Sequence, residues 1–201
     1  FEVQNNDLYL RIDSKTGRFI YSSLENISES KDSEETFRIL GKTYDSESGK
    51  ENNYFTNSGF YTRTQGYLNP EFSEIRELKN NSENRTYLLQ GTSNGMNFVR
   101  KMVMQNDGYA IEVEDTITSS IGDDITVTPY VVIERDASAV EESGLMYTYL
   151  GPVFSSTKDT YEKYDFEDIR ESSYQNKSTG GWVALIQHYF LSAWVPDQSN
   201  D

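Results

Sequence analysis

Hydrophobic and polar residues alternate with a two-residue period in several parts of the chain, a pattern typical of half-buried β-strands. In residues 96–104, four apolar side chains share one face, and only Arg100 interrupts it. Residues 106–108 (Asn-Asp-Gly) predict a tight turn, because Asp-Gly readily adopts positive φ. Residues 109–117 and 125–133 continue the alternation. The pattern predicts a meander of three antiparallel strands, whose apolar face requires a second sheet to cover it.

The first 84 residues contain further strand signals between polar stretches. Four segments are predicted as strands: residues 8–12, 18–24, 36–40 and 54–62. Residues 25–35 and 41–53 are predicted as loops from their polar composition. Residues 63–84 are mostly polar and allow either a helical or an extended conformation.

The C-terminal third is organised differently. Residues 135–180 are polar and tyrosine-rich, and a connection of this length is unusual unless it is functional. In residues 180–196 a double glycine, a final proline and many β-branched and aromatic residues favour two short strands with a bend. Four apolar side chains of this segment are expected in the core: Trp182, Val183, Phe190 and Trp194. The whole pattern predicts an all-β fold, mainly antiparallel with little helix, in which residues 1–201 form a single β-sandwich domain.

Composition and charge exclude several classes of function. The 201 residues include 33 acidic and 18 basic side chains, a net charge of −15, which disfavours binding to nucleic acid or anionic lipid. The absence of cysteine excludes a disulfide framework, thiol catalysis and cysteine-ligated metals. No apolar run approaches the roughly 20 residues of a membrane-spanning helix.

Candidate catalytic residues are few. His188 is the only histidine, and its place inside an apolar segment favours a structural role over general-base chemistry. Paired carboxylates are too numerous for the sequence to select a catalytic pair, and most are expected on solvated faces: Glu34-Glu35, Glu114-Asp115, Asp123-Asp124, Glu141-Glu142 and Glu167-Asp168. Glycine-rich nucleotide motifs and the calcium-loop pattern are both absent. The sequence therefore predicts no cofactor, no metal site and no enzyme.

Three motifs in the last 41 residues resemble one known family. They are Tyr161-Glu-Lys-Tyr-Asp-Phe166, Gly180-Gly-Trp-Val-Ala-Leu-Ile-Gln-His-Tyr-Phe190 and Ala193-Trp-Val-Pro196. Together they resemble the large periplasmic domain of the YidC membrane protein insertases, and weaker similarity extends over nearly the whole chain. The residues that carry the C-terminal motif are Gly180, Gly181, Trp182, Tyr189, Phe190, Trp194 and Pro196.

The resemblance implies a fold, a location and partners. The fold would be a β-supersandwich similar to that of galactose mutarotase-like proteins. The chain would be a non-catalytic periplasmic module, monomeric when isolated, of a bacterial inner-membrane insertase. Its expected partners are the Sec translocon accessory proteins SecD and SecF, and nascent membrane proteins. Since the family's domain continues with further strands after the Ala-Trp-Val-Pro motif, the chain is expected to be a truncated piece of a longer protein.

Residues 137–178 are the predicted partner-binding region, because long connections tend to be functional and tyrosines are favoured at interfaces. The candidate binding residues are Tyr161, Glu162, Lys163, Tyr164, Asp165, Phe166 and Asp168. The same residues could instead simply cover an open end of the sandwich. A second class of function is a carbohydrate-binding or aldose-epimerase-like domain, which would require His188 as its acid and a carboxylate base across a cleft.

Overall fold

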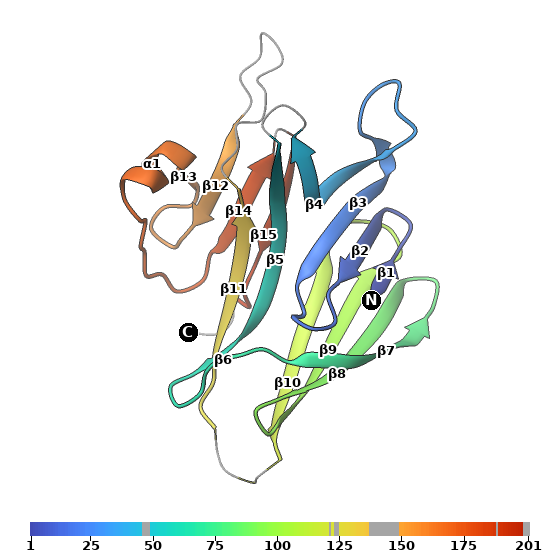
Figure 1. Ribbon diagram of the computed structural model, residues 1–201, viewed down its shortest axis with the longest axis vertical. Helices are drawn as coiled ribbons and strands as arrows, with labels where there is room; N and C mark the ends of the chain where they lie inside the picture. The colour runs from blue at the N-terminus through green and yellow to red at the C-terminus, as the bar shows by residue number, and fades with distance from the viewer. Residues whose placement is uncertain (46–48, 121, 123–124, 137–148, 188, 199–201) are drawn as a thin grey trace. The chain divides into compact units, whose positions relative to one another are not determined.

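The computed structural model describes residues 1–45, 49–120, 122, 125–136, 149–187 and 189–198 (Figure 1). The chain divides into two compact units, which we call unit 1 (Phe1–Arg135) and unit 2 (Asp136–Asp201). The described residues form antiparallel sheets and one short helix. The predicted all-β class is therefore confirmed, whereas a single domain over residues 1–201 stays a prediction.

Unit 1 contains a seven-stranded sheet in the order β1-β2-β3-β4-β5-β11, with β6 pairing to β5. Its strands are β1 (Glu2–Gln4), β2 (Leu8–Ile12), β3 (Phe19–Ser28), β4 (Thr36–Asp45), β5 (Lys50–Thr62), β6 (Gly66–Leu68) and β11 (Thr128–Arg135). The strands predicted within the first 62 residues are all present. Apolar positions with period two, such as Leu8, Leu10 and Ile12, point into the core and are buried.

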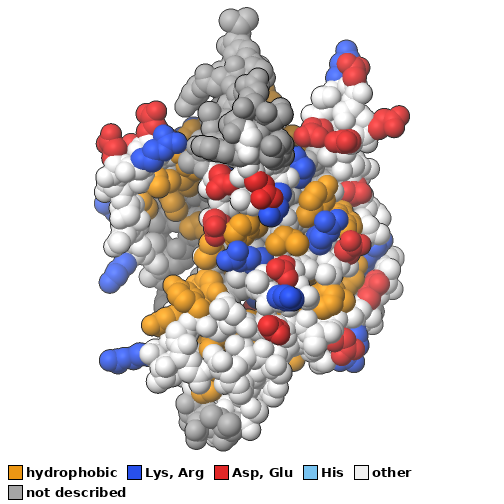
Figure 2. Space-filling view, in the orientation of Figure 1, with side chains coloured by type: hydrophobic (Ala, Val, Ile, Leu, Met, Phe, Trp, Pro, Cys, Tyr) orange, Lys and Arg blue, Asp and Glu red, His pale blue; other side chains and the backbone are white. Residues whose placement is uncertain are grey.

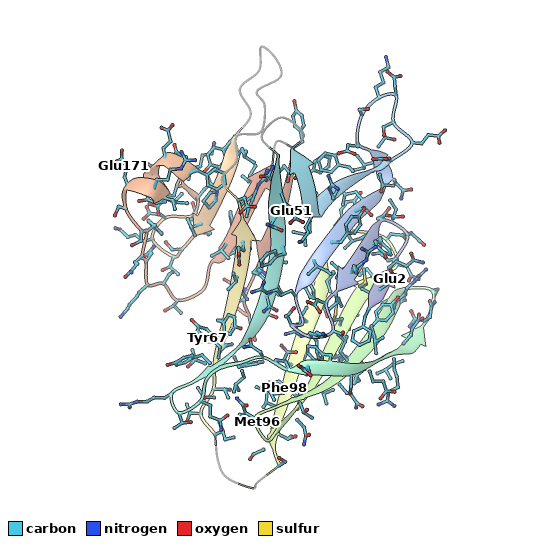
Figure 3. All side chains as sticks on the ribbon, viewed as in Figure 1. Glu2, Glu51, Tyr67, Met96, Phe98 and Glu171 are labelled. Atoms are coloured by element: carbon cyan, nitrogen blue, oxygen red, sulfur yellow. The ribbon has the colours of Figure 1, made fainter. Side chains whose placement is uncertain are left out.

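A four-stranded sheet in the order β10-β9-β8-β7 forms the second layer of unit 1. Its strands are β7 (Glu71–Asn80), β8 (Asn84–Ser93), β9 (Met96–Gln105) and β10 (Ile111–Ser119). The predicted apolar face of β9 is confirmed, since Met96, Phe98, Met102 and Met104 are at most 3% exposed. Phe98, labelled in Figure 3, packs against Phe60 of the other sheet with ring centroids 6.4 Å apart.

The predicted pairing of the third strand of the meander is wrong. β11 does not pair with β10 but with β5, in eight consecutive antiparallel pairs from Thr128↔Tyr61 to Arg135↔Tyr54. The chain therefore crosses from one sheet to the other between β10 and β11. Alternation shows which face of a strand is apolar, but it carries no information about which strand lies beside it.

Two loop predictions were also too broad. Residues 41–53, predicted as a loop, contain the end of β4 and the start of β5, which pair from Gly41↔Tyr54 to Asp45↔Lys50. β3 likewise extends to Ser28, into the predicted loop 25–35. The polar side chains of this hairpin that the structure describes are exposed or half-buried on both faces, so burial leaves no alternation for the sequence to display.

A buried arginine, paired with an aspartate of its own sheet, joins the two sheets of unit 1. The side chain of Arg100 in β9 is 2% exposed, and its guanidinium donates two hydrogen bonds of 2.8 Å to the Asp115 carboxylate in β10. The same guanidinium donates to the carbonyl and hydroxyl oxygens of Ser58 in β5, at 3.1 and 2.9 Å. Arg100 interrupts the apolar face because it satisfies polar groups of both layers at once.

Polar side chains also fasten one end of the sandwich. The Asn5 amide donates to the carbonyl oxygens of Gln105 and Gly108, at 2.7 and 2.8 Å. The Asp7 carboxylate accepts a hydrogen bond of 2.6 Å from the backbone N–H of Gly108. These bonds tie the β1–β2 turn to the β9–β10 turn, so residues about 100 positions apart fix the pairing of the layers.

Unit 2 contains a four-stranded sheet in the order β13-β12-β14-β15 and one helix. Its elements are β12 (Leu150–Ser155), β13 (Glu162–Lys163), α1 (Phe166–Glu171), β14 (Trp182–Gln187) and β15 (Phe190–Trp194). The two short strands predicted in residues 180–196 are thus confirmed. In the part of the chain that the structure describes, no helix has the length and apolar character needed to cross a membrane.

Candidate functional site

The predicted partner-binding segment of unit 2 is an ordered strand and helix. β13 pairs with β12 through Val153↔Lys163 and Phe154↔Glu162, and α1 follows within three residues. Exposure alternates along the segment, and the exposed members of the predicted set are Tyr161, Lys163, Asp165 and Asp168. We call these four residues the 161–168 surface. The other predicted members, Glu162, Tyr164 and Phe166, are half-buried.

The two aspartates of the 161–168 surface hold the start of α1. The Asp165 carboxylate accepts hydrogen bonds from the backbone N–H groups of Glu167 and Asp168, at 2.9 and 3.0 Å. The Asp168 carboxylate accepts in turn from the backbone N–H of Asp165 at 3.3 Å. This reciprocal capping box fixes the direction in which the helix leaves the strand. Both carboxylates stay exposed, so they present negative charge to solvent while they cap.

Aromatic contacts anchor the half-buried face of the segment. Tyr174 stacks on Phe154, with ring centroids 5.0 Å apart and an interplanar angle of 22°, and it lies 5.2 Å from the ring of Tyr164. The Tyr174 hydroxyl donates a hydrogen bond to the Glu162 carboxylate. That bond to an anion is the main cause of a raised pKa at Tyr174, with desolvation second. Tyr164 is held as well, since its hydroxyl donates to the Ser172 carbonyl at 2.8 Å.

Lys163 and Tyr161 form the aromatic and cationic part of the 161–168 surface. The Lys163 ammonium lies 4.5 Å from the ring centroid of Tyr149 and 5.8 Å from that of Tyr161. An exposed cation–π contact contributes about 0.5–1 kcal/mol, enough to bias the side chain without burying it. Tyr161 is 54% exposed, and its ring centroid lies 6.4 Å from that of Trp182. The surface thus combines one open aromatic ring, one cation and two carboxylates.

Sequence reasoning missed two residues that support this surface, Phe154 and Tyr174. They lie 20 positions apart and meet only because β12 pairs with β13 and the chain then returns past α1. No local periodicity connects them. The Gly-Pro dipeptide inside β12 hides that strand further, because proline is unfavourable in most strand positions.

The glycines of the C-terminal motif lie where the backbone makes a close contact, and the structural role of the motif stays a prediction. Gly181 has a φ of +101°, and a Cβ placed on it would lie 2.1 Å from the carbonyl oxygen of Ser155, so only glycine fits. Gly180, with a φ of +72°, precedes it. The Gln198 side chain accepts from the Gly181 N–H at 2.8 Å and donates to the Gly181 carbonyl at 3.0 Å. These bonds link the start of β14 to the chain beyond β15.

The aromatic rings of the motif are less buried than the sequence analysis expects. Trp182, Phe190 and Trp194 are half-buried, and Val183 is half-buried as well. Tyr189 is 76% exposed, and Pro196 is also exposed. Among the residues of unit 2 that the structure describes, the buried apolar side chains are instead Val153, Ala184 and Leu185, which are small or medium in size. A four-stranded sheet with one short helix offers the larger rings too little cover to bury them fully.

Several candidate catalytic residues lie outside the described part of the chain or are already engaged. His188, on which the epimerase alternative depends, lies outside the described residues, as do Asp123-Asp124 and Glu141-Glu142. Asp115, a member of one candidate carboxylate pair, is engaged by Arg100. Among the described residues, no cluster of three or more His, Cys, Asp or Glu side chains could hold a metal ion.

Comparison with known proteins identifies the family. Residues 1–201 match the family model of the YidC periplasmic domain. The chain is 32% identical to the membrane protein insertase YidC of Pseudoalteromonas translucida over 99% of its own length and 37% of the relative. It is 31% identical to the protein of the same name from Haemophilus influenzae, over 98% of the chain and 36% of the relative. It thus spans little more than a third of these relatives. The chain belongs to the YidC periplasmic domain family, the periplasmic part of inner-membrane insertases.

Proposed function

We propose that the chain is a non-catalytic module that assists the insertion and folding of inner-membrane proteins by binding a protein partner at the 161–168 surface. The observation that carries the proposal is the exposure of Lys163 on β13 and of Tyr161 just before it, while the other face of this segment is anchored by Tyr174. Tyrosine combines a large apolar area with a polar hydroxyl and is enriched in interfaces. A rigid, exposed ring needs little further ordering when it binds.

The proposed partners are the Sec accessory proteins SecD and SecF, together with nascent membrane proteins. Support for SecD and SecF comes from the family resemblance alone, whereas the relatives' name, membrane protein insertase, supports nascent clients. The mixture of one cation and two carboxylates on the surface suits a polar interface whose binding depends on salt.

A crosslinking experiment tests the proposal. Photoreactive amino acids are placed at Tyr161, Lys163 and Asp168 of the full-length, membrane-anchored protein, with control probes at Lys101 and Glu114 on the β9–β10 hairpin. Lys101 and Glu114 are also exposed and charged, and they form an ion pair at 3.2 Å. We expect SecD, SecF or nascent chains in the products from unit 2 only. Capture from the hairpin probes and not from unit 2 would show that the binding surface lies elsewhere.

A further inference from the structure

β11 is the last strand of the seven-stranded sheet of unit 1, and its central residues are apolar. No other described strand pairs with the second edge of β11. Figure 1 shows β11 as the long strand beside β5. Its central residues, Tyr130–Ile133, are uncharged and pair with β5 without any register shift. Val131 and Val132 point to opposite faces, and they are 36% and 40% exposed.

The backbone of β11 has donors that face away from β5. Pro129 stands opposite Phe60 and has no N–H, so this position suits a residue whose N–H would point outward. Alternation along the strand then directs the N–H and C=O groups of Val131 and Ile133 outward too. In agreement, the carbonyl of Val132 lies on the β5 side, where it accepts a hydrogen bond of 2.7 Å from the Thr56 hydroxyl.

The edge strands β1, β7 and β10 are each protected against pairing, whereas β11 is protected only near its ends, by Pro129, Glu134 and Arg135. β1 has only three residues. β7 carries Glu74 and Arg76 and shows two register shifts against β8. β10 carries Glu112 and Glu114 on its exposed face. Short length, charges and bulges are the usual means by which sheets prevent added strands. Charges and bulges are absent from the centre of β11, so this part of the edge can pair with an added strand.

Aromatic side chains pack across β5, on the side of β11 away from its free edge, where the Tyr130 ring lies over Gly59. Tyr130 lies edge-on to Tyr67 with ring centroids 5.2 Å apart, and Tyr67 lies edge-on to Tyr61 at 5.3 Å. Tyr67 is 63% exposed and is labelled beside β6 in Figure 3. Figure 2 likewise shows hydrophobic side chains exposed between acidic and basic ones on the face in view. At the free edge itself, the side chains that an added strand would find beside it are those of Val131 and Val132.

We propose that the free edge of β11 binds an extended, basic and apolar segment of another polypeptide as an additional strand. Backbone bonds to Val131 and Ile133 would hold the segment, and alternate side chains would pack beside Val131 and Val132. Charge selects the occupant, because residues 1–135 carry 22 acidic and 14 basic side chains, a net charge of −8. A second copy of the chain would be repelled, whereas a basic segment is attracted. This inference does not depend on the 161–168 surface.

The test uses the 201-residue protein and a fluorescent nonapeptide of alternating valine and threonine between paired lysines. We expect saturable binding by fluorescence anisotropy, with slowed hydrogen exchange at the amides of Val131 and Ile133. The same peptide with glutamate in place of lysine, or with N-methyl groups on alternate amides, is expected to bind at least about tenfold more weakly.

Two variants separate the backbone from the side chain. Val131→Pro removes an outward N–H without removing a bond to β5 and is expected to weaken binding about tenfold or more, whereas Val131→Thr keeps the N–H and should stay within about threefold. Equal urea midpoints establish that both variants fold. If Val131→Pro does not fold, the N-methylated peptide decides alone. Undiminished binding of that peptide, exchange protection at other strands, or a protein dimer that Val131→Pro dissociates would each overturn the proposal.

Discussion

The two units of the molecule are stabilised in different ways. Unit 1 has two sheets with a continuous apolar core, in which side chains such as Leu89, Met102 and Met104 are completely buried. Among the described residues of unit 2, the buried apolar side chains are Val153, Ala184 and Leu185. Most of its larger rings are only half-buried, and some contact one another, as Phe154 and Tyr174 do.

The same difference appears in the residue whose replacement is expected to be most damaging in each unit. In unit 1 the special residue is a buried charge, Arg100, which is costly to leave unpaired. In unit 2 the special residue is Gly181, where the backbone of a neighbouring strand leaves no room for a side chain. Side-chain burial therefore dominates the stability of unit 1, whereas close backbone contact and surface aromatic pairs contribute more in unit 2.

The largest expected effect is that of Arg100→Ala. It removes both hydrogen bonds to Asp115, whose side chain is only 12% exposed, and leaves that carboxylate without its charge partner. We expect the free energy of unfolding to fall by about 3–5 kcal/mol, measured by urea denaturation.

Lys101→Ala is the matched control for this prediction. Lys101 is the next residue of β9, and its ammonium pairs with Glu114 of β10 at 3.2 Å, with both side chains about half exposed or more. Its loss is expected to change stability by less than about 1 kcal/mol. Equal effects of the two substitutions would show that the buried Arg100 interactions contribute no more to stability than the exposed Lys101 pair.

The central hairpin was the most predictable part of the fold, and its charge pair could also have been predicted from the sequence. The alternation in residues 96–117 and the turn at residues 106–108 fix the register of β9 and β10. That register places Asp115 directly opposite Arg100, so the apparent interruption of the apolar face already had a partner on the next strand. Local pattern and turn chemistry were sufficient because the interaction is local.

Non-local pairing could not be predicted in the same way. β11 pairs with β5 about 70 residues earlier, and nothing in its own alternation distinguishes β5 from β10 as its neighbour. The candidate surface was predicted in part. The sequence indicated Tyr161 and Lys163, but the support from Tyr174 depends on the path of the chain around α1.

Gly181→Ala is expected to have the next largest effect, in unit 2. The new Cβ would meet the Ser155 carbonyl oxygen at 2.1 Å, and the φ of +101° is itself unfavourable for alanine. We expect a loss of about 2–4 kcal/mol in urea denaturation. Gly108→Ala is the control, because its φ of +110° is similar but no atom lies within 4 Å of the new Cβ. A loss as large for Gly108→Ala would attribute the whole effect to backbone conformation.

Trp182→Ala tests whether burial differs between the units as described. Since the indole is only half-buried, we expect a cost of about 2 kcal/mol, below the roughly 3–5 kcal/mol of a fully buried ring. Met102→Ala in unit 1, where the side chain is fully buried, is expected to cost more although methionine is smaller than tryptophan. If Trp182→Ala proves the more damaging, unit 2 has a larger effective core than its exposure indicates.

The smallest expected effect is a shifted titration at Tyr174. The hydrogen bond to the Glu162 carboxylate favours the protonated phenol and raises its pKa above the ordinary value of about 10. A group whose pKa is raised on folding stabilises the folded state below its unfolded pKa. That contribution is lost as the pH rises through the folded pKa, so the contact weakens only above about pH 10. Absorbance titration at 295 nm measures the shift, and the Tyr174→Phe difference spectrum assigns it.

Glu162→Gln keeps an acceptor but removes the charge, so the midpoint of Tyr174 should move back towards 10. A midpoint unaffected by Glu162→Gln would mean that the carboxylate does not hold this ring, and the anchored face of the 161–168 surface would need another explanation.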